Sequence, residues 1–213
     1  MVTKYIIMAG GNYEKWQTPR QLIKIKGEPI IARTIRLLRE NGITDISISS
    51  NNPDFEAFAP VLYHNNDYYA RQYNDMDGYW CDAFYPETEP VCYLFGDVVF
   101  SPEAIRTIIS TETDDIMLFG SRWPFAPNYP KWYIEPFAFK VQNQTHLRQA
   151  IDDVKRMDKE GVFGRKPIAW ELWSVIRGFN PNQICEDYVV INDYTCDIDN
   201  QNEIEAVSAC VSE

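Results

Sequence analysis

The feature that most constrains the fold is an alternation of short apolar runs with a helical pattern near the start of the chain. Residues 5–8 form an apolar run that stops at Gly10, as a buried strand does where it enters a turn. Residues 31–38 repeat apolar side chains at helical spacing, with Arg33 expected on the solvent face, and residues 43–48 are rich in isoleucine. A strand, a helix and a second strand in this order predict a right-handed βαβ crossover and therefore a parallel sheet.

The remaining sequence extends this pattern and becomes less regular after residue 120. We expect strands at 91–95, 116–119, 133–141 (interrupted at Pro136) and 188–191. We also expect one helix that begins at Ser101 and three more at 147–154, 170–176 and 203–210. The predicted fold class is a Rossmann-like three-layer α/β/α sandwich with a mostly parallel central sheet. A length of 213 residues suits one domain, so we expect a single domain over residues 1–213.

Charge and apolar content exclude several classes of function. The formal net charge is −11 at pH 7, and such a chain repels phosphate backbones at long range, which argues against a nucleic-acid partner. No stretch approaches the ~20 apolar residues that span a bilayer, so we predict no membrane span and a cytoplasmic location. The sequence leaves the oligomeric state open.

The cysteines are odd in number and widely spaced, a pattern that fits neither a disulfide framework nor a zinc site. We expect them to be small buried hydrophobes in a reducing compartment. They are Cys81, Cys92, Cys185, Cys196 and Cys210.

The turn after the first predicted strand is a candidate phosphate-binding loop. Its backbone comprises Ala9, Gly10, Gly11 and Asn12, and paired glycines let backbone N–H groups approach phosphate oxygens without obstruction by side chains. Lys15 and Arg20 then bring two positive charges to the same segment of an otherwise acidic chain. Taken alone, this pattern is also typical of an ordinary turn, and it matches neither a Walker loop nor a spaced-glycine dinucleotide fingerprint.

The order of motifs along the chain is more specific than any one of them. The loop leads through residues 25–30 into the first helix, a later strand ends at Gly96-Asp97, and residues 196–204 carry the acidic segment C-D-I-D-N-Q-N-E-I. With these motifs, residues 4–105 and 188–207 resemble the nucleotidyltransferases that share the fold of family-A glycosyltransferases. These include sugar-phosphate nucleotidylyltransferases, small cytidylyltransferases and molybdenum-cofactor guanylyltransferases.

The resemblance implies an NTP-dependent, Mg²⁺-dependent nucleotidyltransferase. Such an enzyme transfers NMP from an NTP to a phosphorylated small molecule and releases pyrophosphate. Residues 1–120 would form the nucleotide-binding half, and residues 121–213 the half that binds the acceptor and supplies the second metal ligand. This sequence departs from the family pattern at Tyr13, where a glycine is usual, and it exchanges the two cations, with Lys15 at the position of an arginine and Arg20 at that of a lysine.

Three aspartates are the candidate metal ligands. Asp97 follows a buried apolar strand, and Asp197 and Asp199 are two residues apart, so they would face the same side of an extended segment. Oxygen-only ligands favour Mg²⁺, with Mn²⁺ as an alternative. Family position ranks Asp197 above Asp199, and which of the two binds the metal stays open. With Lys15 and Arg20, Asp97 completes the predicted catalytic set.

An aromatic, proline-rich segment is the candidate acceptor site. Trp123, Trp132, Tyr133 and Glu135 crowd into it, and aromatic faces beside a carboxylate suit either a sugar ring or the quaternary ammonium of a phosphocholine-like acceptor. Core packing is the alternative reading of the same residues. Two other functions stay open at this point: a glycosyltransferase of the same fold that uses a nucleotide sugar, and a nucleotide-binding relative without catalytic activity.

Overall fold

The structure is a computed structural model, and it describes residues 2–10, 16, 18–63, 79–122, 125, 129 and 133–211. Its centre is a seven-stranded sheet in the order β10-β8-β9-β6-β1-β4-β5. The strands are β1 (Lys4–Met8), β4 (Asp45–Ser50), β5 (Val61–Tyr63), β6 (Val91–Phe95), β8 (Ile116–Gly120), β9 (Pro136–Val141) and β10 (Val189–Val190). Only β9 runs antiparallel to its neighbours, so the sheet is mostly parallel, as predicted.

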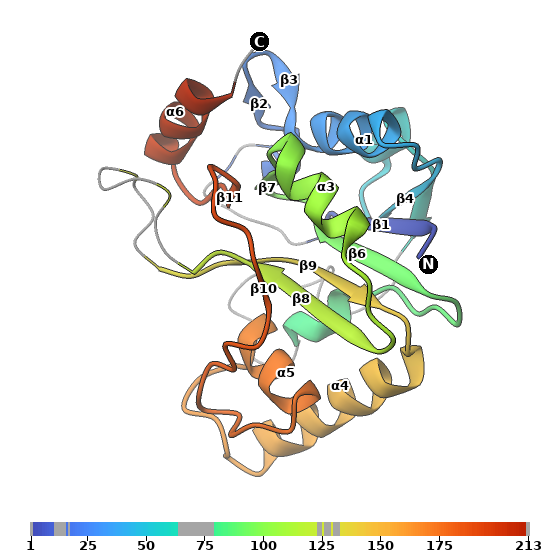
Figure 1. Cartoon of the computed structure of the whole chain (residues 1–213), viewed down its shortest axis with the longest axis vertical. Coiled ribbons are helices and arrows are strands. Elements are labelled where there is room, and N and C mark those ends of the chain that lie inside the picture. Colours follow the sequence, from blue (N-terminus) through green and yellow to red (C-terminus); the bar gives the residue numbers. More distant parts are fainter. Residues whose placement is uncertain are drawn as a thin grey trace.

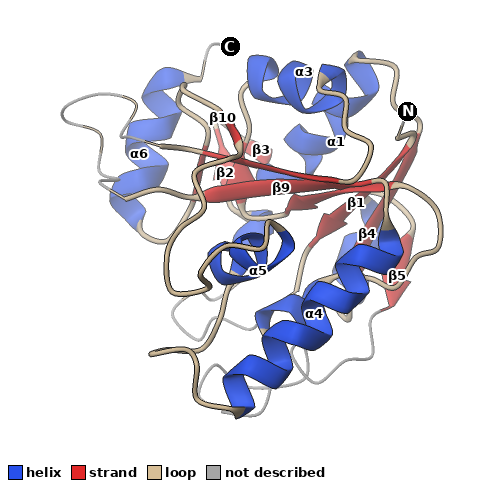
Figure 2. Cartoon of the chain, turned by 60° about the horizontal axis from the view of Figure 1, so that its bottom comes forward, coloured by secondary structure: helices blue, strands red, loops and turns tan. Residues whose placement is uncertain are grey.

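Helices cover both faces of this sheet (Figure 1). They are α1 (Ile30–Glu40), α3 (Pro102–Ser110), α4 (Gln144–Lys159), α5 (Ala169–Ile176) and α6 (Gln201–Cys210). Figure 2 shows α1 and α3 above the sheet and α4 and α5 below it. Burial of the central strands drives this layering, because all five residues of β6 and the apolar residues of β1 are buried. The predicted three-layer α/β/α sandwich is therefore confirmed.

A smaller apolar cluster lies beside the main core and carries the C-terminal segment. It involves the hairpin of β2 (Lys24–Ile25) and β3 (Glu28–Pro29), the antiparallel pair β7 (Val98–Val99) and β11 (Cys196–Asp197), and α6. Ile25, Val99, Ile198 and Val207 are buried in it. Because β7 directly follows the end of β6, this cluster holds residues 196–199 against the carboxyl edge of the main sheet.

Short 3₁₀ segments connect the main elements: η1 (Arg20–Leu22), η2 (Pro53–Ala57) and η3 (Trp80–Ala83). Local capping explains where two helices begin. The hydroxyl of Ser101 accepts from the N–H of Ala104 at 2.8 Å, and Asn200 caps α6 together with Glu203. Within the described residues, no helix is both long and apolar enough to cross a membrane.

Two local expectations are corrected by the structure. The predicted strand over 133–141 begins only at Pro136, because proline has no N–H to donate and is tolerated at the first position of a strand. Arg33 is 6% exposed rather than on the solvent face of α1. Its guanidinium donates to the carbonyl of Phe100 at 3.3 Å and to the hydroxyl of Tyr194 at 3.1 Å, so burial does not leave the charge without hydrogen bonds.

Four of the five cysteines are buried, as expected, and the fifth is not. Cys81, Cys92, Cys185 and Cys196 are buried, Cys210 is partly buried, and all five are free thiols.

Candidate active site

The predicted loop and the predicted strand end meet at the carboxyl edge of the sheet. Ala9 follows β1, and its N–H donates to the carbonyl of Ser49 at 2.9 Å in the neighbouring β4. On the other side of β1, the N–H of Gly96 donates to the carbonyl of Met8 at 2.9 Å. Ligands of open parallel sheets bind at this edge. Of the predicted loop, Gly11, Asn12 and Lys15 lie outside the described residues.

Arg20 is the cation that the structure places at this edge. Its side chain is 5% exposed, and its guanidinium forms ion pairs with Asp97 and with Asp199, the latter at 2.5 Å. It also donates to the carbonyl of Ile198 at 2.9 Å. The forked guanidinium thus joins the end of β6 to the segment after β11, which a lysine with its single point charge would do less well.

The C-terminal acidic segment reaches Asp97 by a route that the sequence did not predict. The strands β6 and β10 run parallel, in keeping with the predicted mostly parallel sheet, but residues 197–199 lie several residues beyond the end of β10. They follow the antiparallel pairing of β11 with β7, in which Asp197 lies opposite Val98. The N–H of Ile198 then donates to the carbonyl of Asp97 at 3.1 Å. This pairing brings both predicted metal-binding segments together.

Glu135 lies close to Asp197 and Asp199, although the sequence suggested it only as an acceptor-binding residue. We call Asp97, Glu135, Asp197 and Asp199 the acidic site. Carboxylate oxygens of Glu135, Asp197 and Asp199 lie within 4.8 Å of one another. Glu135 is 3% exposed and precedes β9, where its N–H donates to the hydroxyl of Ser121 at 2.9 Å. One of its carboxylate oxygens accepts from the N–H of Asp197 at 3.3 Å. A lone glutamate 62 residues before Asp197 gives no sequence signal for this contact.

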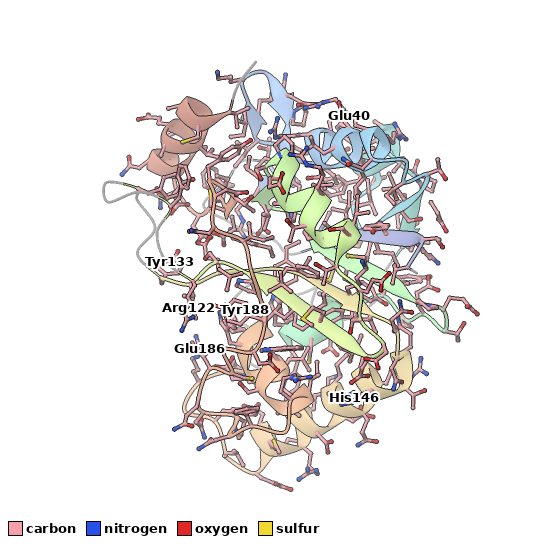
Figure 3. The ribbon with its side chains drawn as sticks, viewed as in Figure 1. Glu40, Arg122, Tyr133, His146, Glu186 and Tyr188 are labelled. Carbon is pink, nitrogen blue, oxygen red and sulfur yellow. The ribbon has the colours of Figure 1, made fainter. Side chains whose placement is uncertain are left out.

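Tyr133 also contacts the acidic site, because its hydroxyl donates to Asp199 at 3.0 Å. Figure 3 shows Tyr133 on the same side of the molecule (left in this view) as Arg122 and Glu186, which form an ion pair. Two predicted acceptor residues, Tyr133 and Glu135, therefore lie beside the predicted metal ligands. The other two, Trp123 and Trp132, lie outside the described residues.

The charges of the site act on Asp97 in opposite directions. Burial raises the pKa of this carboxyl, the guanidinium of Arg20 opposes the rise, and the carboxylates of Asp197 and Asp199 add to it. The site therefore concentrates negative charge that one arginine balances only in part. Carboxylate oxygens are hard ligands, and a set made only of them suits Mg²⁺ or Mn²⁺ better than Zn²⁺. The residues present thus fit a divalent cation.

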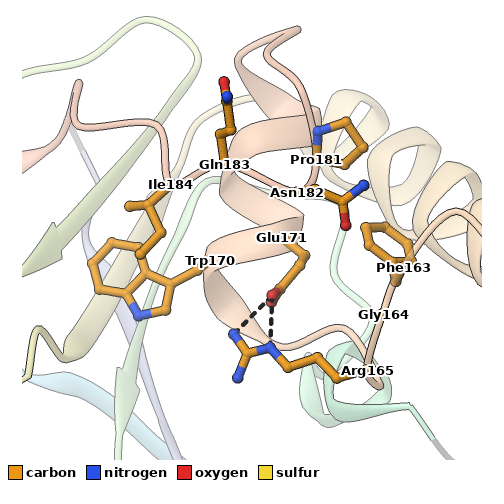
Figure 4. A pocket seen from close by; sticks show the side chains of 9 residues that line it. All are labelled: Phe163, Gly164, Arg165, Trp170, Glu171, Pro181, Asn182, Gln183 and Ile184. Carbon is orange, nitrogen blue, oxygen red and sulfur yellow. Dashed lines mark hydrogen bonds and ion pairs between the residues drawn. The ribbon is translucent and has the colours of Figure 1, made fainter.

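Two other features lie apart from these residues. His146 pairs with Asp115 at 2.8 Å, far from Tyr133 in Figure 3. A pocket of about 400 Å³ lies by α5 and the segment that follows it, where Arg165 and Glu171 face each other across an ion pair (Figure 4). Neither feature contributes a side chain to the acidic site.

The fold is that of nucleotidyltransferases. The chain is similar in structure to 4-diphosphocytidyl-2C-methyl-D-erythritol synthase from Anaerococcus prevotii, with a TM-score of 0.56, 13% identity, and coverage of 98% of this chain and 95% of that chain. It is also similar to CTP:phosphocholine cytidylyltransferase from Streptococcus pneumoniae, with a TM-score of 0.54, 15% identity and 99% of each chain covered. A hypothetical transferase from Thermus thermophilus gives a TM-score of 0.54 at 14% identity, over 96% of this chain and 100% of that chain.

The sequence itself supplies the family. Residues 5–161 match the model of the MobA-like NTP transferase domain, which is more than half of the chain. The protein therefore belongs to the family of MobA-like NTP transferase domains, and its function is of the nucleotidyltransferase type. No curated protein sequence matches it significantly. The resemblance seen in the order of the motifs is thereby confirmed.

Proposed function

We propose that the protein transfers NMP from an NTP to a phosphorylated small molecule and releases pyrophosphate. The observation that carries this proposal is the meeting of Arg20 with Asp97, Asp197 and Asp199 at the carboxyl edge of β1 and β6. A cation that can contact phosphate and carboxylates that can bind a metal are the two requirements of phosphoryl chemistry. Membership of the family supports the same reaction.

In the nucleotide half, residues 1–120, each group has a distinct role. The backbone N–H groups of Ala9, Gly10, Gly11 and Asn12 would bind the phosphates, and Lys15 would contact the β- and γ-phosphates. Arg20 offers two parallel donors to the α-phosphate, where negative charge develops. An acceptor phosphate oxygen attacks the α-phosphorus in line and pyrophosphate leaves. A phosphate is already deprotonated near pH 7, so this reaction needs no general base.

Asp97, with Asp197 or Asp199, would hold Mg²⁺, for which Mn²⁺ is an alternative. When bound, the ion supplies positive charge to the phosphate oxygens. Support for this ligand set comes from its all-oxygen chemistry, from the pairing of both Asp97 and Asp199 with Arg20, and from the short distance between Asp197 and Asp199. Asp199 contacts Arg20 and Tyr133, whereas Asp197 donates its N–H to Glu135, so the two aspartates have different surroundings.

In the acceptor half, residues 121–213, we propose that Trp123, Trp132, Tyr133 and Glu135 line the acceptor site. The position of Tyr133 and Glu135 beside the acidic site supports this, because the acceptor phosphate must reach the α-phosphorus. Candidate acceptors are a sugar 1-phosphate or a phosphocholine-like molecule. CTP is the first NTP to test, since two structural neighbours bear names of cytidylyl chemistry. We also propose that the protein is cytoplasmic, since the proposed use of an NTP and the five free cysteines suit that location.

The test is pyrophosphate release from a panel of NTPs and phosphorylated acceptors, after a thermal-shift screen selects those that bind. We expect EDTA to abolish release and Mg²⁺ to restore it. Asp97→Asn should lose most activity, whereas the matched variant Asp115→Asn, whose carboxylate pairs with His146 far from Tyr133, should retain it. Full activity in EDTA would overturn the metal assignment. Turnover of a nucleotide sugar alone would indicate a glycosyltransferase, and binding without any turnover would indicate an inactive relative.

Two further variants test the individual roles. Lys15→Ala should weaken NTP binding or turnover by ~10-fold or more, since a charge-assisted contact contributes ~1.5–3 kcal/mol. Trp132→Ala should raise the KM for the acceptor with little change in NTP affinity. A Trp132→Ala protein that unfolds would instead favour core packing for this aromatic segment.

A further inference from the structure

Arg20 holds together two carboxylates that the proposed function assigns to a metal ion. One guanidinium nitrogen pairs with Asp97 and the other with Asp199 at 2.5 Å, while the carbonyl of Ile198 accepts at 2.9 Å. The side chain is 5% exposed, and an arginine stays protonated at any pH that the fold tolerates. A permanent buried cation thus lies between the end of β6 and the segment after β11.

Asp97 stands outside the group of carboxylates that approach one another most closely. Glu135, Asp197 and Asp199 have oxygens within 4.8 Å of one another, whereas Asp97 shares the guanidinium of Arg20 with Asp199. A metal ion bound to Asp97 and Asp199 would share both carboxylates with the guanidinium, which already pairs with one oxygen of each. Two cations close to each other also repel strongly where little water screens them. Arg20 and a metal ion therefore compete for Asp97.

We propose that Arg20 is a displaceable internal counter-ion, which suppresses metal binding until phosphate groups take over its hydrogen bonds. This inference rests on the proposed function and adds a coupling to it. The guanidinium fork fits two phosphate oxygens as well as it fits two carboxylates. When Arg20 turns to a nucleotide phosphate, Asp97 and Asp199 become available to a cation. The protein should therefore bind a divalent cation weakly by itself and strongly only together with its nucleotide.

Mn²⁺ binding to the full chain without any nucleotide tests the proposal, because free Mn²⁺ is measured directly by electron paramagnetic resonance. The variant is Arg20→Gln, which keeps a hydrogen-bonding side chain and removes the charge. We expect it to bind Mn²⁺ ~10-fold or more tightly than the parent, since each charge-assisted contact that competes is a strong one. Mn²⁺ alone should also raise the melting temperature of Arg20→Gln more than that of the parent.

The matched control is Arg36→Gln, which makes the same change of net charge on the exposed face of α1, where Arg36 pairs with Glu28 and Glu40. It should leave Mn²⁺ affinity unchanged. The double variant Arg20→Gln/Asp97→Asn should lose the gain, because the carboxylate set free by the first change is removed by the second. An equal gain in Arg36→Gln would mean that net charge alone explains the effect, and would overturn the proposal.

Unchanged or weaker Mn²⁺ binding by a folded Arg20→Gln protein would also overturn it, because Arg20 would then support the metal site. If Arg20→Gln does not fold, Arg20→Met also removes the charge, keeps an unbranched side chain and should tighten Mn²⁺ binding in the same way; no tightening in that variant refutes the coupling. Pyrophosphate release by the parent protein separates the two claims. Turnover without tighter Mn²⁺ binding in the variants removes only this inference, whereas tighter binding in a protein without turnover removes only the proposed function.

Discussion

Gly96 is the residue whose substitution tests how the site is built. It links β6 to Asp97, and its N–H donates to the carbonyl of Met8 at the end of β1. A Cβ at this position would lie 2.6 Å from that carbonyl oxygen and 3.0 Å from Cγ of Gln21. The backbone of Gly96 is not in the left-handed region, so the cost of Gly96→Ala is steric alone. Alanine should therefore push the end of β6 away from β1.

The size of the effect follows from this contact. The separation from the Met8 oxygen must grow by at least 0.4 Å to reach 3.0 Å, below which real Cβ contacts are essentially never found. The obstacle is backbone in the middle of the sheet, which cannot rotate away as a side chain can. Overpacking of this kind costs ~1–3 kcal/mol. For a chain of this length, each kcal/mol lowers Tm by ~2–4 °C, so Gly96→Ala should melt ~2–12 °C below the parent.

Urea unfolding followed by far-ultraviolet circular dichroism measures this loss. The matched control is Gly164→Ala, where the added Cβ has no neighbour within 4 Å and the backbone is not left-handed. Its free energy of unfolding should stay within about 0.5 kcal/mol of the parent. A Gly96→Ala protein as stable as Gly164→Ala would show that the end of β6 yields freely, and would refute the argument that β1 fixes the position of Asp97.

Two further predictions concern protonation. Hydrogen bonds from Arg36, each 2.8 Å long, lower the pKa of Glu28 from 4.5, so the stability they add is present above that value and is lost as the pH falls through the lowered one. Glu28→Gln should lower the free energy of unfolding by less than ~1 kcal/mol at pH 7, because solvent screens this ion pair, and should leave it unchanged near pH ~2. Urea unfolding at both pH values measures the difference between variant and parent. A difference that does not depend on pH would contradict the prediction. Burial raises the pKa of the Cys81 and Cys92 thiols to about 12, so iodoacetamide should label Cys210 first in the folded protein, as read by peptide mass spectrometry. Labelling of Cys81 at the rate of Cys210 would contradict that expectation.

Elements with strong local signals could be predicted from the sequence. The strand at 91–95 has the predicted bounds, because five apolar residues lie between Pro90 and Gly96. The start of α3 follows from the cap at Ser101 and the proline after it. Arg33 was placed on the wrong face of α1, because helical periodicity gives no sign that Phe100 and Tyr194 would offer oxygens to a buried guanidinium.

The acidic site could be predicted only in part. The order of the motifs indicated Asp97 and residues 197–199, but not the way in which they meet. Strands of two residues, such as β7 and β11, carry no periodicity, so their antiparallel pairing has no sequence signal. Glu135 comes from a different segment and reaches Asp197 through tertiary contacts that depend on the whole sheet. The pairing of Arg20 with Asp97 and Asp199 likewise joins segments far apart in the sequence, so no local pattern predicts it.

The electrostatics of the site have one consequence for how a nucleotide enters it. Among the described residues, the carboxylates of Asp97 and Asp199 pair with Arg20, and those of Glu135 and Asp197 lie close to Asp199. The net charge of −11 on the whole chain does not attract a free triphosphate at long range, so Lys15 and Arg20 would act on it only at short range. A triphosphate that carries a divalent cation brings positive charge to the carboxylates and oxygen acceptors to Arg20 in one event. Under the proposed function, we therefore expect the nucleotide to enter as its metal complex rather than in a step separate from the metal.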